Sequence, residues 1–245
     1  MSPRATLATA RRVLEQLRHD PRTVVLLVAL PSLLLWLFRY VFDDSPQVFG
    51  RVGLPMLGIF PFVTMFLVTS IAMVRERTSG TLERLLTTPM HKLDLLAGYA
   101  LAFGLVALAQ AGIAAWVALG PLGLEVKAGV WLVLTLAVLN ALLGMALGLF
   151  LSAFATTEFQ AVQFMPAAVI PQVLLAGLLT PRDNMADVLR WASDALPMSY
   201  ALDALSAARS ESSVTTAIAV DLLVMVGCVL AALALGAATL RRRTP

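Results

Sequence analysis

The chain has 245 residues, of which 59% are hydrophobic and 13% are charged. Soluble domains carry about 25% charged residues, so the composition excludes a soluble globular protein and indicates one that lies mostly in lipid. The net charge of +3 does not indicate nucleic-acid binding, because the basic residues flank apolar segments instead of forming a stripe. The single cysteine, Cys228, excludes a disulfide framework.

Six apolar segments predict an all-α membrane protein with six transmembrane helices in a single domain, residues 1–245. A hydrocarbon core of about 30 Å requires roughly 20 apolar helical residues, and each segment reaches that length. The connections between them are too short for a second, soluble domain. The expected spans are approximately 24–42, 54–74, 93–119, 129–154, 160–180 and 214–240.

Residues 1–22 precede the first span and predict an amphipathic helix that lies along the cytoplasmic membrane surface. Leucines recur there at helical spacing, charged residues occupy the other faces, and Pro21 ends the pattern. The alternative is an ordinary basic flank that only sets topology. The residues assigned to this interface helix are Arg4, Leu7, Arg11, Leu14, Glu15, Leu17 and Arg18.

The segment RERTSGTLERLLTTPM, residues 75–90, separates the second and third spans and holds much of the charge of the chain. Ser79 and Gly80 suit a helix N-cap, and Pro89 disfavours helix at the residue before it. Between them, three leucines fall at i, i+3 and i+4, and an acidic side chain lies in the first turn, which the helix dipole favours. The pattern predicts a short amphipathic helix over 79–89 on the cytoplasmic side.

This segment resembles the hallmark of the type-2 ATP-binding-cassette exporter permeases, which has the form E-R-x-x-G-T-L-E-x-L-L-x-x-P. Two later stretches, EFQAVQFMPAAVIPQVLLAGLLTP and VLRWASDALPMSYALDALSAAR, resemble the family's fifth span and its outer-leaflet helices. The resemblance covers essentially the whole chain and is closest to the bacterial drug-resistance branch, which includes daunorubicin exporters. About ten residues join the first two spans, so the large external domain of some relatives is absent from that position.

The resemblance implies that 79–89 is the coupling helix, which docks in a groove of a separate ATPase subunit. It also implies two copies of that ATPase, which bind ATP and Mg²⁺, and a second permease subunit, either identical or homologous. This chain itself lacks the G-x-x-x-x-G-K-[ST] loop that cradles phosphates, and is therefore not expected to be an enzyme. The ATPase-coupling residues are Glu76, Arg77, Gly80, Thr81, Leu82, Glu83, Arg84, Leu85, Leu86 and Pro89.

In the family, the second and fifth spans line the substrate pathway between two permease subunits. Aromatic, methionine and amide side chains in these spans and in the fourth are therefore candidates for substrate contact, since methionine suits promiscuous surfaces. Helix packing and interhelical hydrogen bonds are the alternative role for each of them. These residues are Phe62, Met65, Phe66, Asn140, Gln163, Phe164, Met165 and Gln172.

Three other features complete the prediction. Gly144 and Gly148 form a small-xxx-small pair in the fourth span, which indicates close helix packing. Residues 183–208 predict two outer half-helices, the second starting at Pro197; a plain solvated loop is the alternative. His19 and His91 have no metal-ligand neighbours at the required spacing, so no metal site is expected.

Charge sets the expected orientation. Twelve of the 18 basic residues fall before the first span, between the second and third, and after the sixth. With six spans these regions share one side, which the positive-inside rule makes cytoplasmic. We therefore expect a multi-pass protein with both termini in the cytoplasm and lipids as its surroundings. The resemblance to the bacterial drug-resistance branch implies that the membrane is the bacterial inner membrane.

The functional prediction is the permease subunit of an ATP-driven exporter of hydrophobic or amphipathic small molecules. Two alternatives stay open: an exporter of cell-envelope glycan or glycolipid, and a membrane sensor that signals without transport. The glycan alternative requires a wide channel with many polar side chains, and the spans here are sparsely polar.

Overall fold

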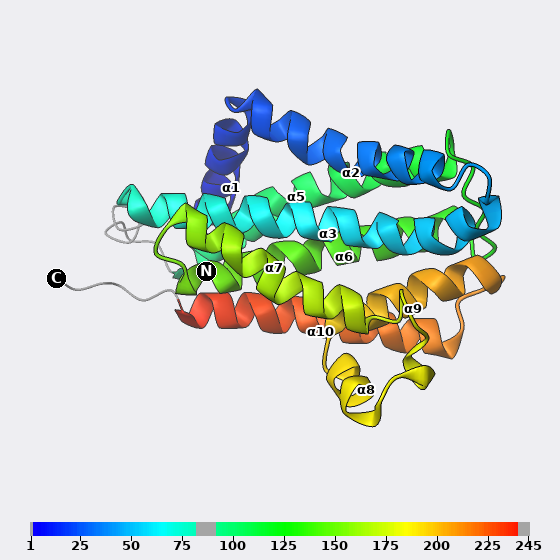
Figure 1. Cartoon of the computed structure of the whole chain (residues 1–245). Coiled ribbons are helices and arrows are strands. Elements are labelled where there is room, and N and C mark those ends of the chain that lie inside the picture. Colours follow the sequence, from blue (N-terminus) through cyan, green and yellow to red (C-terminus); the bar gives the residue numbers. More distant parts are fainter. Residues whose placement is uncertain (1, 82–91, 240–245) are drawn as a thin grey trace.

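The structure is a computed structural model, and it describes residues 2–81 and 92–239. Regular structure within these residues is entirely helical, which confirms the predicted class. Five of the helices are long and apolar enough to cross a membrane, and they run side by side in one bundle (Figure 1). They are α2 (Pro21–Val41), α3 (Pro46–Thr78), α5 (Lys92–Leu119), α6 (Val130–Leu151) and α10 (Thr216–Thr239).

Proline marks where several helices begin. The N-terminal helix α1 (Pro3–Arg18), α2, α3 and α9 (Pro197–Ser210) all have proline in their first turn. The ring presets φ for a helix, and the missing N–H is one that the first turn leaves unpaired in any case. Asp20 also caps α2, because its carboxylate accepts a hydrogen bond from the Thr23 N–H at 3.2 Å. The first span therefore separates from α1 within two residues.

Helix α3 is the central rod of the bundle. It has 33 residues, which gives a length of about 50 Å at 1.5 Å per residue and exceeds the roughly 30 Å hydrocarbon core. It begins eight residues before the expected second span, so only residues 42–45 connect it to α2. It packs against α2, α5, α6, α7 and α9. One helix thus joins the two ends of the molecule (Figure 1).

The tightest helix contact joins α3 and α6. A Cβ atom at Gly144 would collide with the Phe62 carbonyl oxygen, and one at Gly148 would collide with the Phe66 carbonyl oxygen. These are backbone atoms, which cannot move aside as a flexible side chain does. The prediction of close packing at this glycine pair is confirmed.

The expected fifth span forms a shorter helix, α7 (Glu158–Leu175), preceded by the 3-10 turn η1 (Ser152–Phe154). Its 18 residues end just before Gly177, whose φ of +84° is a left-handed turn conformation that glycine adopts without strain. Helix α7 is not among the five candidate spans in the described part of the chain, so the count of six spans stays a prediction.

The chain leaves α7 through the 3-10 turn η2 (Arg182–Asn184) and α8 (Asp187–Asp194), which projects from the bundle. Helix α9 then continues to the far end, and α10 returns (Figure 1). The hydroxyl of Ser193 donates to the Leu175 carbonyl at 2.8 Å and shares a 2.9 Å hydrogen bond with Ser199. It therefore ties α7, α8 and α9 together. The predicted helix start at Pro197 is confirmed.

Helix α1 crosses the bundle at the end where α10 finishes (Figure 1). It packs mainly against α5, where a Cβ atom at Gly98 would overlap the side chain of Thr9. Ala10 and Val13 are buried beside this crossing, whereas Leu7 is 60% exposed. The predicted N-terminal helix is present. Its most buried side chains are Thr9, Ala10 and Val13 and not the leucines of the predicted apolar face.

Candidate functional site

The candidate site lies at the end of the bundle where α3 stops, just before residues 82–91 in the chain. Helix α3 ends at Thr78, and Gly80 has a φ of +70°, the left-handed conformation that commonly ends helices. The predicted break at Ser79 and Gly80 is therefore confirmed, and Thr81 follows within the described residues. The remaining predicted coupling residues lie outside them: Leu82, Glu83, Arg84, Leu85, Leu86 and Pro89.

Three consecutive residues near the end of α3 bind three different parts of the bundle. Arg75 forms a two-pronged ion pair with Glu158 at the start of α7, with N–O distances of 3.0 and 3.1 Å. Glu76 binds α1, and Arg77 binds the turn that ends α6. We call Arg75, Glu76 and Arg77 the α3 junction. Residues 79–81 follow the α3 junction closely in the chain.

The contact between Glu76 and α1 is largely buried. Glu76 is 8% exposed, and its carboxylate accepts a hydrogen bond of 3.1 Å from Nη1 of Arg12 and one of 3.4 Å from Nε2 of Gln16. Nη2 of Arg12 donates to the Tyr99 hydroxyl on α5, and the same guanidinium lies over the Tyr99 ring. Arg12 therefore joins α1, α3 and α5. Charge-assisted hydrogen bonds of this kind are about twice as strong as neutral ones.

Arg77 binds the C-terminal end of α6. Its Nη1 donates to the Ser152 carbonyl at 2.7 Å, and its Nη2 donates to the Ser152 hydroxyl at 3.2 Å. Carbonyls in the last turn of a helix lack intrahelical partners and carry partial negative charge. A cation at this position satisfies one of them and fixes the end of α6 to the end of α3.

A second contact anchors the start of α1 on α5. Asp94 is fully buried, and its Oδ1 accepts a hydrogen bond of 3.0 Å from the Ser2 N–H. A carboxylate at a helix N-terminus gains from the helix dipole, so this contact stabilises the docked position of α1. Neither Asp94 nor Tyr99 was predicted as a site residue. The sequence feature that could have identified them is an acidic and a phenolic side chain in the first turns of an otherwise apolar span.

An apolar cavity of about 710 Å³ opens beside the α3 junction, between α1, α2, α3 and α5. Its walls are mainly leucine, valine and isoleucine, whereas Asp20, Arg75, Glu76 and Glu158 lie at its polar edge. Helix α3 presents to it one stripe at helical spacing, namely Thr64, Leu67, Val68, Ile71, Ala72 and Arg75. The sequence did not predict this stripe, because α3 is apolar on every side and its faces therefore cannot be told apart by hydrophobicity.

The electrostatics of the polar edge favour ionised carboxylates. Hydrogen bonds from Arg75 lower the pKa of Glu158 below its ordinary value, and the hydrogen bonds from Thr23 lower that of Asp20. Both groups therefore stay charged at neutral pH. The cavity combines an apolar interior with a charged edge, which is the chemistry that an amphipathic molecule requires.

The residues predicted to contact substrate do not form one site within this chain. Phe62, Met65 and Phe66 are fully buried, on the side of α3 that faces α6. Asn140 is also buried, and its amide lies 3.6 Å from the sulfur of Met198 on α9. The four from α7 are spread around that helix: Gln163 is exposed, Phe164 and Met165 are half-buried, and Gln172 is buried.

The residues predicted for the interface helix divide between two environments. Leu17 lines the apolar cavity, and Leu14 packs against the core. Arg11 and Glu15 form an exposed ion pair of 2.8 Å with each other, and Arg4 and Arg18 are exposed. Helix α1 therefore presents a charged outer face and an inner face that closes the cavity.

Comparison with known proteins gives relatives that are transport proteins. The chain is 25% identical to ABC transporter G family member 20 of Dictyostelium discoideum over 150 residues, which are 61% of this chain and 20% of the relative. It is 27% identical over 130 residues to the probable multidrug ABC transporter permease YbhR of Escherichia coli (strain K12), covering 53% of this chain and 35% of the relative. A third relative is the inner membrane transport permease YhhJ of the same strain, 26% identical over 149 residues.

The matched region is less than half the length of each of these relatives; for YhhJ it is 60% of this chain and 39% of the relative. The family profile described as ABC-2 type transporter matches residues 4–208. This match runs from α1 to near the end of α9 and includes the α3 junction and all residues that line the apolar cavity. The chain therefore belongs to the ABC-2 type transporter family.

Proposed function

We propose that the chain is the membrane-spanning permease subunit of an ATP-driven exporter that moves hydrophobic or amphipathic, drug-like small molecules out of the cell. The observation that carries this proposal is the 710 Å³ apolar cavity beside the α3 junction. Its volume falls within the range of about 300–1,000 Å³ typical of small-molecule sites. Burial of apolar surface, at about 25 cal/mol per Å², supplies affinity without fixed geometry, which suits varied lipophilic cargo.

The cavity also supplies a charge preference that the sequence left open. The acidic groups at its edge are Asp20, Glu76 and Glu158. Glu158 pairs with Arg75 and Glu76 pairs with Arg12, whereas Asp20 has no ion pair among the described residues and leaves the edge with an excess of negative charge. A cationic or zwitterionic head group would meet a net negative edge while its apolar body contacts the leucines. Amphiphiles with a positive group are therefore the preferred cargo in this proposal.

In this proposal, the energy for transport comes from two copies of a separate ATPase subunit. They bind and hydrolyse ATP with Mg²⁺ and dock on residues 79–89. A second permease subunit completes the transporter, and both termini face the cytoplasm. Movement of the coupling segment would act on α3 at Arg75, Glu76 and Arg77, and their contacts would carry it to α7, α1 and α6. Glu76 and Arg77 then act within the chain as transmitters of movement.

The test fills the cavity. Ala72→Phe places a phenyl ring in the cavity wall, and Ala234→Phe makes the same change on the exposed face of α10 as the matched control. Each variant is purified together with its ATPase and reconstituted into vesicles. Export of a panel of cationic lipophilic dyes is then measured with and without ATP.

We expect Ala72→Phe to lower ATP-dependent export about tenfold, equivalent to about 1.4 kcal/mol, and Ala234→Phe to transport normally. Equal transport by both variants would contradict the assignment of this cavity. Export of undecaprenyl-linked glycans and of none of the dyes would instead support the glycan alternative.

A further inference from the structure

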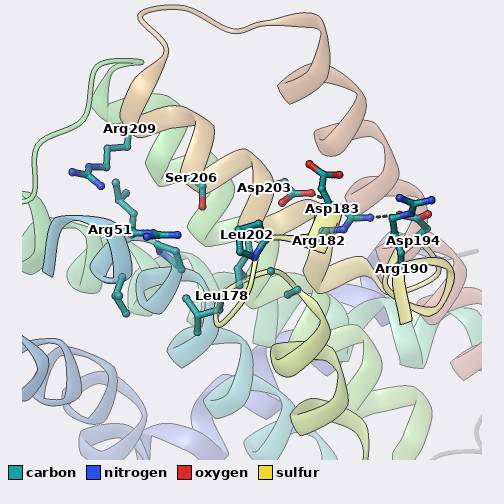
Figure 2. Close-up of a pocket in the computed structure, with 16 residues that line it drawn as sticks. Arg51, Leu178, Arg182, Asp183, Arg190, Asp194, Leu202, Asp203, Ser206 and Arg209 are labelled. Carbon is teal, nitrogen blue, oxygen red and sulfur yellow. Dashed lines mark hydrogen bonds and ion pairs between the residues drawn. The ribbon is translucent and has the colours of Figure 1, made fainter. Parts of the chain in front are cut away.

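A second cavity, of about 590 Å³, lies near the start of α3, at the opposite end of the bundle from the α3 junction. Figure 2 shows the residues that line it. Its walls come from the first turns of α3, the turn after α7, helix α8 and helix α9. Unlike the apolar cavity, it is rich in charge, with four arginines and three aspartates among its lining residues. Neither the coupling mechanism nor the amphiphile cavity uses any of these residues.

One side of this charged cavity is balanced within the chain. Arg182 donates hydrogen bonds to Asp203 and to Asp194, and its guanidinium lies over the ring of Tyr200. Arg190 pairs with Asp187 at 3.3 Å. Two of the four arginines are therefore already neutralised, and Figure 2 shows them together on the same side of the cavity.

The other side carries two arginines, Arg51 on α3 and Arg209 on α9. Neither forms an ion pair or a side-chain hydrogen bond among the described residues. The guanidinium of Arg209 lies over α3 at Gly50, where its Nη2 would be 3.3 Å from a Cβ atom. It is therefore next to the backbone of Arg51. Both arginines line the same cavity. Two cations that share a cavity without an acidic partner repel each other, and an anion bound there reduces that repulsion.

We propose that this cavity binds a phosphate group, as a monoester or diester, through Arg51 and Arg209. The planar guanidinium donates two parallel hydrogen bonds to phosphate oxygens, which makes arginine the preferred side chain for this chemistry. Ser206 lies on the same side and adds a hydroxyl donor (Figure 2). Asp183 lies across the cavity, beside Asp203, and its charge confines an anion to the Arg51 side.

The remaining lining residues indicate which chemical group is attached to the phosphate. Leu178 and Leu202 form an apolar part of the wall between the two charged sides. A phosphodiester with an aliphatic substituent fits this arrangement, as in a phospholipid headgroup at the membrane surface. Free phosphate offers the same oxygens, and the experiment separates the two sources.

The test uses the full chain, purified in an uncharged detergent, and two probes: inorganic phosphate and dihexanoyl phosphatidylglycerol. Dihexanoylglycerol, which has the same acyl chains without the phosphate, is the probe control. Binding is measured by native mass spectrometry and by thermophoresis. The variants are Arg51→Gln, Arg209→Gln and the double change. The matched control is Arg39→Gln, which changes an arginine of α2 that is paired with Asp43.

We expect each single variant to weaken phosphatidylglycerol binding about tenfold, as is typical when one charge-assisted hydrogen-bonding group is lost. The double variant should abolish it, Arg39→Gln should leave it unchanged, and Arg209→Lys should restore part of it. Binding of the lipid alone assigns the site to a headgroup, and binding of inorganic phosphate with equal affinity assigns it to the free anion. Wild-type affinity in the double variant, equal binding of dihexanoylglycerol, or no binding of either phosphate probe would overturn the proposal.

Discussion

Replacing Glu76 by alanine removes the acceptor that joins α1 to the end of α3. In the native protein the carboxylate takes hydrogen bonds from Arg12 and Gln16. The Arg12 guanidinium keeps its contact with the Tyr99 hydroxyl but loses its only nearby carboxylate among the described residues. The variant therefore leaves a charge partly buried and without its counter-ion.

The size of the effect follows from the burial of the pair. The side chains of Arg12 and Glu76 are 27% and 10% exposed, so the pair lies between a surface pair, worth about 0–1 kcal/mol, and a fully buried one, whose disruption costs about 3–5 kcal/mol. We expect a loss of about 2–3 kcal/mol in the free energy of unfolding. For a domain of this size that corresponds to a decrease in Tm of roughly 4–12 °C.

The assay is thermal unfolding of the purified protein in detergent, together with ATP hydrolysis by the assembled transporter. Glu15→Ala is the matched control, since Glu15 also pairs with an arginine of α1 but on its exposed face; its Tm should not change measurably. A double-mutant cycle with Arg12→Ala isolates the pairwise energy. If the α3 junction transmits movement, Glu76→Ala should also reduce the stimulation of ATP hydrolysis by transported dyes.

A coupling energy below about 0.5 kcal/mol, which is the usual limit of additivity between independent sites, would refute the reasoning about stability. Normal dye stimulation in a variant whose Tm has fallen as expected would refute the transmission role and leave the structural role intact. The two readouts therefore separate the two claims.

Three further outcomes are expected. Gly144→Ala should prevent correct folding because the new Cβ atom collides with the α3 backbone. Gly112→Ala is the control and should keep the native Tm, because its Cβ atom meets no atom within 4 Å. Similar yields and Tm values for both variants would contradict the packing argument. Because the pKa of Glu158 is lowered, its pair with Arg75 stabilises the protein above the ordinary pKa of 4.5, and this stabilisation is lost as the pH falls through the lower pKa of the folded state. The Tm difference between wild type and Glu158→Gln should therefore disappear on acidification. A difference that grows in acid would count against the pair. Leu85→Asp should leave membrane insertion intact but abolish co-purification with the ATPase, because a buried carboxylate without a partner is costly; normal co-purification would argue against docking at 79–89.

The sequence by itself determined the helical class, most of the helix positions and the break at the end of α3. Uninterrupted apolar segments of about 20 residues favour helix, because a helix satisfies every N–H and C=O within the segment when no water is present. Prolines and caps then act locally, as Pro21 with Asp20 and Pro197 demonstrate. The motif at 75–90 also indicated the family, which the profile match over residues 4–208 shows.

Tertiary structure alone decided which residues meet. Arg12 and Glu76 are 64 positions apart, and Arg75 and Glu158 are 83 apart, so no local pattern could pair them. Nor could hydropathy tell the side of α3 that packs on α6 from the side that lines the cavity, because both are apolar. That choice depends on where Gly144 lets the two backbones approach: the close approach buries Phe62 against α6 and turns the face with Val68 and Ala72 toward the cavity.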